Sequence, residues 1–153
     1  MIIVIVSVLG AMTVVRYYKP TEITVSVEAD HVARDIRHMQ MLAITWGQTL
    51  RFSILAGNTR YRVTCASGSA VAPCTGAVTA VTDPATGTPF ETPVAGLQNN
   101  VTVAGAALDI DALGRPVTGS ALLNGDTTYT LTGGPETSTV TVARLTGFVA
   151  VAY

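Results

Sequence analysis

Charged residues are scarce in this chain of 153 residues, of which Asp, Glu, Lys and Arg make up 12%. Soluble globular domains usually contain about 25% charged residues. The formal net charge is −1 and no basic run is present, which excludes the electrostatic footprint of a nucleic-acid-binding protein. We therefore expect any partner to be recognised through shape and apolar surface, not through a strong electrostatic field.

Cysteine and histidine are also scarce, with two residues of each. Cys65 and Cys74 are separated by ASGSAVAP, a spacing that fits neither a C-x-x-C redox motif nor a zinc site. His31 and His38 lie elsewhere, on what we expect to be a solvated helix face, so a four-ligand zinc site is disfavoured. The cysteines are either a disulfide that closes a small loop or two separate thiols, and export from the cell favours the disulfide.

Signatures of catalysis are missing: the sequence has no G-x-S-x-G, no P-loop and no G-x-G-x-x-G. Asp109 and Asp111 alternate around Ile110, so a strand would place both carboxylates on one face, as in a glycosidase pair or a calcium site. The Leu-Gly-Arg-Pro that follows is more simply a turn in which Arg115 neutralises one of the acids. We therefore expect no enzyme activity, no cofactor and no metal.

One long apolar run contrasts with this composition: residues 1–15 carry no charge, and Arg16 ends the run. The run lacks the positive start and the small-residue cleavage site of a secretory signal. As a helix it would rise about 22 Å, which is short of the ~30 Å hydrocarbon core of a membrane. Such a stem needs a membrane or a filament core to cover it, and the alternative is a buried core helix of a globular protein.

An amphipathic helix pattern follows the run. It predicts a helix over about residues 28–47, ended by Gly47. Between Gly10 and about Val27 we expect a kink or an unwound stretch, because β-branched residues are frequent there. The apolar positions recur every three or four residues and are expected to pack against a sheet: Val32, Ile36, Met39, Ala43, Trp46 and Leu50.

Short alternating runs separated by turn residues begin after this helix and predict an antiparallel sheet over about residues 50–151. The predicted strands are residues 50–55, 61–65, 77–81, 100–103, 107–110, 128–132, 139–143 and 147–151. The fold class is therefore α+β, with the apolar stripe of the helix covering the sheet. Residues 66–99 are rich in Pro and Gly and predict an ordered, loop-rich excursion.

Three stretches of the sequence resemble the type IV pilin and pseudopilin superfamily. MIIVIVSVLGAMTVVRYY (residues 1–18) resembles the hydrophobic helix of these proteins. ADHVARDIRHMQMLAITWGQ (residues 29–48) is similar to the end of their long helix, and LDIDALGRP (108–116) and STVTVARLTGFV (138–149) are similar to their sheet motifs. The likeness is closest to prepilins of the mannose-sensitive haemagglutinin type and to minor pseudopilins of type II secretion.

The resemblance implies a pilin-like fold with two parts, an apolar stem helix at residues 1–20 and a globular pilin domain at residues 21–153. It also implies a structural subunit that forms a helical homopolymer, an extracellular type IV pilus filament with a role in cell adhesion. Before polymerisation the subunit would lie in the inner membrane with the assembly machinery. The filament-core helix would then contain Met1, Ile2, Ile3, Val4, Ile5, Val6, Val8, Leu9, Gly10, Met12, Val14 and Val15.

Members of this superfamily begin with an N-methylated aromatic residue and a short segment that contains a glutamate. The resemblance implies that roughly seven such residues precede Met1, which would lengthen the stem to a full membrane span. It also makes the Thr and Ser residues of the domain candidate sites for glycans, although the strand propensity of Thr explains them equally well. Two alternatives remain open, a minor pseudopilin of a type II secretion system and a membrane-tethered binding module.

Overall fold

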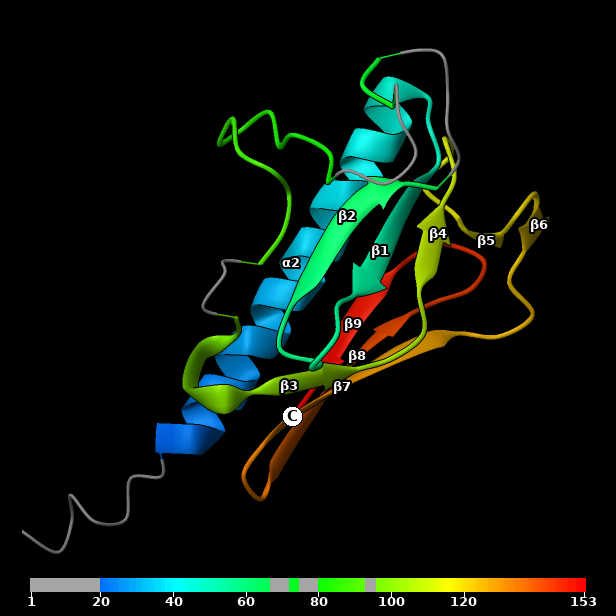
Figure 1. Ribbon diagram of the computed structural model, residues 1–153. Coiled ribbons are helices and arrows are strands. Elements are labelled where there is room, and N and C mark those ends of the chain that lie inside the picture. Colours follow the sequence, from blue (N-terminus) through cyan, green and yellow to red (C-terminus); the bar gives the residue numbers. More distant parts are fainter. Residues whose placement is uncertain (1–19, 67–71, 75–79, 93–95) are drawn as a thin grey trace, which may run out of the picture.

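The computed structural model describes residues 20–66, 72–74, 80–92 and 96–153. This part of the chain consists of one long helix that lies across two antiparallel sheets (Figure 1). The α+β fold class predicted from the sequence is confirmed.

Helix α2 (Pro20–Trp46) begins about eight residues before the predicted start. The expected unwinding is therefore wrong for residues 20–27, whereas residues 10–19 lie outside the described part of the chain. Proline is favoured at the first position of a helix, because its φ is already helical and its missing N–H would have no partner there. Val25 and Ala29 are buried at 1% and 0% exposure, and such packing outweighs the weak helix propensity of β-branched residues.

The C-terminal end of α2 follows the sequence prediction. Gly47 adopts a left-handed conformation with φ of 64°, which glycine reaches without steric cost. The amide of Gln48 then donates to the carbonyl oxygen of Ala43 at 3.2 Å, as in the common glycine-terminated helix end.

The first sheet has five strands in the spatial order β2-β1-β4-β5-β6, and all neighbouring pairs are antiparallel. Its strands are β1 (Leu50–Ile54), β2 (Tyr61–Cys65), β4 (Leu108–Ile110), β5 (Pro116–Thr118) and β6 (Ala121–Leu122). Leu50 of β1 lies opposite Cys65 of β2 on one side and Ile110 of β4 on the other.

The second sheet has four antiparallel strands in the order β3-β7-β8-β9. These are β3 (Thr102–Ala104), β7 (Thr127–Gly133), β8 (Glu136–Val142) and β9 (Val149–Ala152). One face packs against α2, and buried and more exposed residues alternate along β7 and β8, as expected for a sheet covered on one side. The outer face carries only uncharged side chains: Thr102, Ala104, Thr128, Thr130, Thr132, Thr137, Thr139, Thr141, Ala150 and Ala152.

Two details of the sheets differ from the sequence prediction. The hairpin of β5 and β6, joined through Gly119 and Ser120, was not predicted. The predicted strand at residues 77–81 lies mostly outside the described residues, and Ala80 makes only a single bridge to Thr64 of β2.

The core lies between α2 and the sheets. The ring of Phe52 on β1 lies 4.9 Å from the ring of Tyr61 on β2 and 5.2 Å from that of Tyr129 on β7, so these aromatic contacts join the two sheets. Of the residues predicted to pack helix against sheet, five are fully buried and Trp46 is partly buried: Val32, Ile36, Met39, Ala43 and Leu50. Leu50 contributes from β1 and not from the helix.

The described residues of the excursion at residues 66–99 cover the free edge of β2. The amide of Val63 donates to the carbonyl oxygen of Phe90 at 2.9 Å, and the amide of Val81 donates to the carbonyl oxygen of Val63 at 2.9 Å. Phe90 is itself buried. Because an uncovered edge strand is a template for pairing with other chains, this segment protects one side of the domain.

Candidate assembly surface

The residues predicted to form the filament core, residues 1–15, lie outside the described part of the chain. Within the described part, no helix combines the length and the apolar character that crossing a membrane requires. What the structure defines is the continuation of that segment, α2, and the surface around its exposed side.

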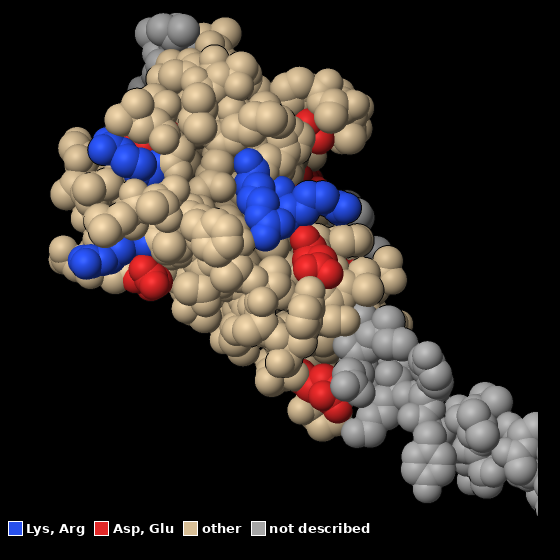
Figure 2. All heavy atoms as spheres, turned by 180° about the vertical axis from the view of Figure 1, so that it is seen from behind, with Lys and Arg blue, Asp and Glu red and all other residues tan. Residues whose placement is uncertain are grey.

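Six exposed residues form a stripe along one side of α2, next to the edge of the second sheet. They recur at alternating intervals of three and four, which places them on one helix face: Val27, Asp30, Arg34, Arg37, Met41 and Ile44. The stripe is apolar at both ends and charged in the middle, with its acid nearer the N-terminus than its two arginines. On the face seen in Figure 2, basic side chains lie near the centre and acidic side chains lie below them.

A groove of about 420 Å³ lies beside the C-terminal half of this stripe. The residues that line it come from α2, from the turn after β4, from the loop between β8 and β9 and from the start of β9: Arg37, Gln40, Ile44, Leu113, Gly114, Thr146, Gly147, Phe148 and Val149. Leu113 and Phe148 are 68% and 69% exposed, so the rim of this Arg37 groove presents apolar side chains to solvent. Single exposed apolar residues are ordinary, but a cluster of them is typical of an interaction surface.

Hydrogen bonds from α2 hold the floor of the Arg37 groove. The guanidinium of Arg37 donates to the carbonyl oxygen of Val149 at 2.8 Å, and the amide of Gln40 donates to the carbonyl oxygen of Gly147 at 2.6 Å. Gly147 has φ of 69°, and a Cβ atom there would lie 2.5 Å from the carbonyl oxygen of Gly114 and against the Gln40 amide. Glycine is therefore required for the two loops to approach each other.

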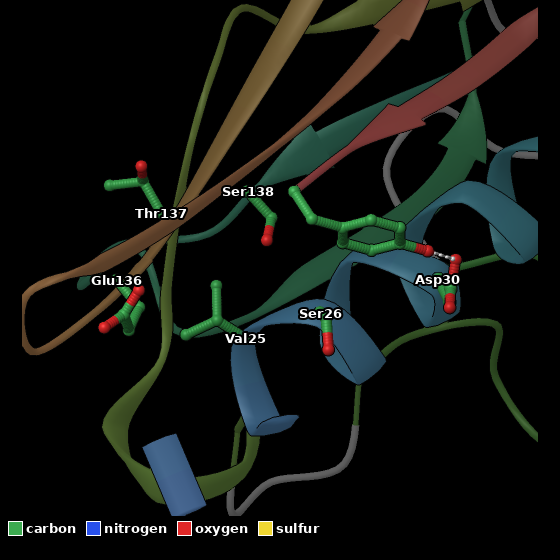
Figure 3. Close-up of a pocket in the computed structure, with 7 residues that line it drawn as sticks. Val25, Ser26, Asp30, Glu136, Thr137 and Ser138 are labelled. Carbon is green, nitrogen blue, oxygen red and sulfur yellow. Dashed lines mark hydrogen bonds between the residues drawn. The ribbon is translucent and has the colours of Figure 1, made fainter. Parts of the chain in front are cut away.

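A second hollow, of about 290 Å³, lies beside the N-terminal half of the stripe. Its lining residues are Val25, Ser26, Asp30, Glu136, Thr137, Ser138 and Tyr153 (Figure 3). The hydroxyl of Tyr153 donates to Oδ1 of Asp30 at 2.8 Å, and this hydrogen bond raises the pKa of Tyr153. The ring of Tyr153 is 73% exposed, so an aromatic side chain projects next to a carboxylate at this Asp30 pocket.

The two carboxylates around Ile110 each have an arginine partner. Asp109 accepts hydrogen bonds from Arg51 at 2.7 and 2.8 Å, and Asp111 accepts them from Arg115 at 2.8 and 3.0 Å. Burial acts to raise the pKa of Asp111, but the hydrogen bonds from Arg115 and from two backbone amides outweigh it, so this pKa lies below its usual value. The prediction that Arg115 neutralises one acid in a turn is confirmed, and Arg51 is the partner that the sequence did not reveal.

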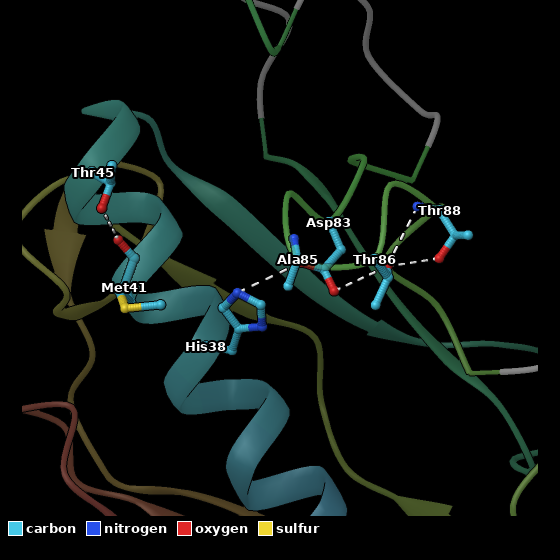
Figure 4. A network of polar contacts seen from close by, with 7 residues as sticks. All are labelled: His38, Met41, Thr45, Asp83, Ala85, Thr86 and Thr88. Carbon is cyan, nitrogen blue, oxygen red and sulfur yellow. Dashed lines mark hydrogen bonds and ion pairs between the residues drawn. The ribbon is translucent and has the colours of Figure 1, made fainter.

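The two histidines differ in their surroundings. His31 is 41% exposed and its Nδ1 atom lies 3.9 Å from the buried carboxylate of Glu28. His38 is not on a solvated face as predicted: its Nε2 atom lies 3.7 Å from Asp83 (Figure 4). Its ring lies 5.3 Å from that of Phe90. His38 thus attaches the excursion to α2.

The remaining predicted site residues are the cysteines. Cys65 and Cys74 form a disulfide with an S–S distance of 1.99 Å, which links the end of β2 to the excursion. Over the residues that the structure describes, no group of three or more His, Cys, Asp or Glu side chains is placed to hold a metal ion.

Comparison with known proteins identifies the fold of this chain. No family model matches the sequence, and no curated protein matches it. The structure of the minor pseudopilin EpsH from the Type 2 Secretion System of Vibrio cholerae superposes with a TM-score of 0.60 at 14% identity, over 84% of this chain and 95% of that chain. The type IV minor pilin FimU of Pseudomonas aeruginosa superposes with a TM-score of 0.57 at 12% identity, over 84% of this chain and 88% of that chain.

The chain has a pilin fold. At these low identities the likeness establishes the fold alone, and at that level it confirms the resemblance noted in the sequence. In the pilin fold described here, the exposed stripe of α2, the Arg37 groove and the Asp30 pocket all lie along the seam between the long helix and strand β9.

Proposed function

We propose that this chain is a structural subunit that polymerises through its apolar N-terminal segment into an extracellular type IV pilus filament. Residues 1–20 act as the stem, and residues 21–153 act as the globular domain that forms the wall of the filament. The observation that supports this most strongly is the combination of a pilin fold with an uncharged run, residues 1–15, just before its long helix.

The energetics of the stem support polymerisation. In the inner membrane, before assembly, the stem is stabilised by about 25 cal/mol for each Å² of apolar surface removed from water. A filament core preserves this stabilisation from buried apolar surface, because the stems of neighbouring subunits replace the lipid. Ser7, Gly10 and Ala11 are small, and small residues let apolar helices approach closely.

The outer face of the second sheet supports a place in the wall of a filament. Its Thr and Ala side chains are uncharged and mostly partly exposed, so neighbouring domains can lie close together without repulsion between like charges. The excursion covers the edge of β2, which limits unspecific pairing of strands between subunits.

A charge in the stem tests the proposal. We expect Ile5→Asp to abolish filaments on cells that produce the full chain, because a carboxylate in an apolar helix bundle costs about 2.5–3.5 kcal/mol. Ile5→Leu is the matched control and keeps the filaments. Protease resistance of the domain shows whether both variants are folded, and normal filament numbers from a folded Ile5→Asp variant would contradict the proposal.

A second candidate is a minor pseudopilin of a type II secretion system, which the likeness to EpsH favours. Such a subunit would share the fold and the stem but belong to a short assembly of few subunits. In that case Ile5→Asp stops protein secretion by the cell, and the wild-type chain gives no long fibres in electron micrographs.

A membrane-tethered binding module would use the stem only as an anchor. Its detergent-solubilised form remains monomeric at all concentrations, whereas a polymerising subunit associates. Size-exclusion chromatography with light scattering on the solubilised full chain separates these two functions.

A further inference from the structure

The seam between α2 and β9 carries two surfaces of opposite chemistry at different heights. Arg37 is the only charged residue among those that line its groove, and the other side chains at the rim, Ile44, Leu113 and Phe148, are apolar and exposed. At the Asp30 pocket, the carboxylate of Asp30 lies beside the exposed side chain of Tyr153. One surface is therefore a cationic apolar groove, and the other is an anionic end with an aromatic side chain.

We propose that the Arg37 groove binds the Asp30 end of a second copy of this chain, so that Asp30 of one copy pairs with Arg37 of the next. The parallel arrangement of the copies rests on the proposed function, because stems inserted in one membrane make their helices point the same way. A second copy is the occupant because a single chain carries both complementary surfaces.

The charge pattern of the stripe disfavours contact between two copies at the same height. Two parallel copies at the same height would place Asp30 opposite Asp30 and Arg37 opposite Arg37, and like charges repel. An offset of seven residues, about 10.5 Å along a helix, brings Asp30 level with Arg37 of its neighbour. The same offset brings Val27 level with Arg34, whose long aliphatic stem can cover an apolar side chain.

Apolar contacts add to the ion pair. Tyr153 is 73% exposed at the Asp30 end, and Phe148 is 69% exposed at the rim of the groove. Aromatic residues at the centre of an interface contribute a large share of its binding energy. An exposed ion pair alone contributes at most about 1 kcal/mol, so the apolar part supplies affinity and the ion pair sets the offset.

The Arg37 groove and the Asp30 pocket lie on the same side of α2, so a partner seated there covers both surfaces of each copy. The parallel contact therefore joins two copies in a staggered pair with one Asp30–Arg37 ion pair. An antiparallel arrangement would also pair Asp30 with Arg37, but it would do so twice within one closed dimer. The two arrangements therefore predict different products.

Cysteine cross-linking between copies tests the contact. Both native cysteines are held in the Cys65–Cys74 disulfide, so an introduced cysteine has no native partner. Full-length chains with Asp30→Cys and Arg37→Cys are produced together, oxidised, and separated on non-reducing gels from both the membrane and the filament fractions. Cross-linking within one helix is impossible, because residues seven apart lie about 10.5 Å apart and a disulfide spans at most about 7 Å between Cα atoms.

The expected product of the mixture is a covalent dimer that neither single variant gives. A chain that carries both substitutions is expected to give a dimer in which one introduced thiol of each copy stays free to react with a maleimide. The antiparallel arrangement would use both introduced thiols of each copy and would overturn the proposed offset. Val27→Cys with Arg34→Cys is a second pair at the same spacing that leaves Arg37 and its bond to Val149 in place, and it should cross-link as well.

Asp30→Cys with Thr128→Cys is the matched control, because Thr128 is exposed on the outer face of the second sheet. It should give no dimer. Absence of dimers from both stripe pairs overturns the contact, and so does cross-linking to a different protein in place of a second copy. If filaments are present but no cross-linked dimer forms, the contact fails while polymerisation through the stem stands. If no filaments form, the membrane fraction still decides on the contact.

Discussion

Arg37 on α2 donates a hydrogen bond to the carbonyl oxygen of Val149, 2.8 Å away, at the start of strand β9. Strand β9 is the last strand of its sheet, so its outer carbonyl groups have no strand beyond them. The helix therefore covers this edge through a side chain that also lines a surface groove. Because the same contact closes the sheet and positions the guanidinium, the Arg37 groove is formed before any partner binds.

Gly147 provides a test of how the groove is built. We expect Gly147→Ala to lower the free energy of unfolding by about 2–4 kcal/mol, because φ there is 69° and the added Cβ would lie 2.5 Å from the carbonyl oxygen of Gly114. Gly134 has φ of 61° with no atom within 4 Å of an added Cβ. Gly134→Ala should therefore cost only about 1–2 kcal/mol. Urea unfolding of the solubilised chain measures both, and equal losses would show that the approach of the two loops has no role.

Two buried tyrosines allow the contribution of one buried hydrogen bond to stability to be measured. The hydroxyl of Tyr61 donates to Asp35 at 2.7 Å, whereas that of Tyr129 has no hydrogen-bond partner among the described residues. We expect Tyr61→Phe to destabilise the chain by about 1.5 kcal/mol, and Tyr129→Phe to change stability by less than about 0.5 kcal/mol or to increase it. A larger loss from Tyr129→Phe would show that its hydroxyl has a partner.

The same tyrosines predict instability in alkali. Burial, together with the charge of Asp35, raises the pKa of Tyr61, and burial, together with the charge of Asp109, raises that of Tyr129. Above pH ~10 the unfolded chain loses both protons while the folded chain keeps them, so stability falls as pH rises, by about 1.4 kcal/mol per pH unit for each tyrosine. Between pH 10 and 12, the free energy of unfolding should fall less steeply with pH in Tyr61→Phe than in the wild-type chain. An unchanged slope would contradict this assignment.

The spacing of apolar residues and of turn residues along the sequence predicted much of the fold. The spacing of Val32, Ile36, Met39 and Ala43 identified the buried side of α2, and Gly47 identified its end, because each depends on a few neighbouring residues. The turn with Arg115 was predictable for the same reason, since its partner Asp111 is four residues away.

The features that the sequence did not reveal depend on residues far apart. Arg37 and Val149 are separated by 112 positions, and no local pattern indicates such a contact. His38 reads as a polar residue on a solvated helix face until Asp83 and Phe90 are placed beside it. The early start of α2 was missed because local propensity disfavours β-branched residues, whereas the burial of Val25 depends on the sheets.

Negative-stain electron microscopy of native material from cells that produce the full chain tests the central claim most directly. The account predicts long, uniform fibres that disappear in the Ile5→Asp variant and remain in Ile5→Leu, with this chain as their main component by mass spectrometry. Only monomers or short particles in the wild-type sample, with the chain present and folded, would contradict it.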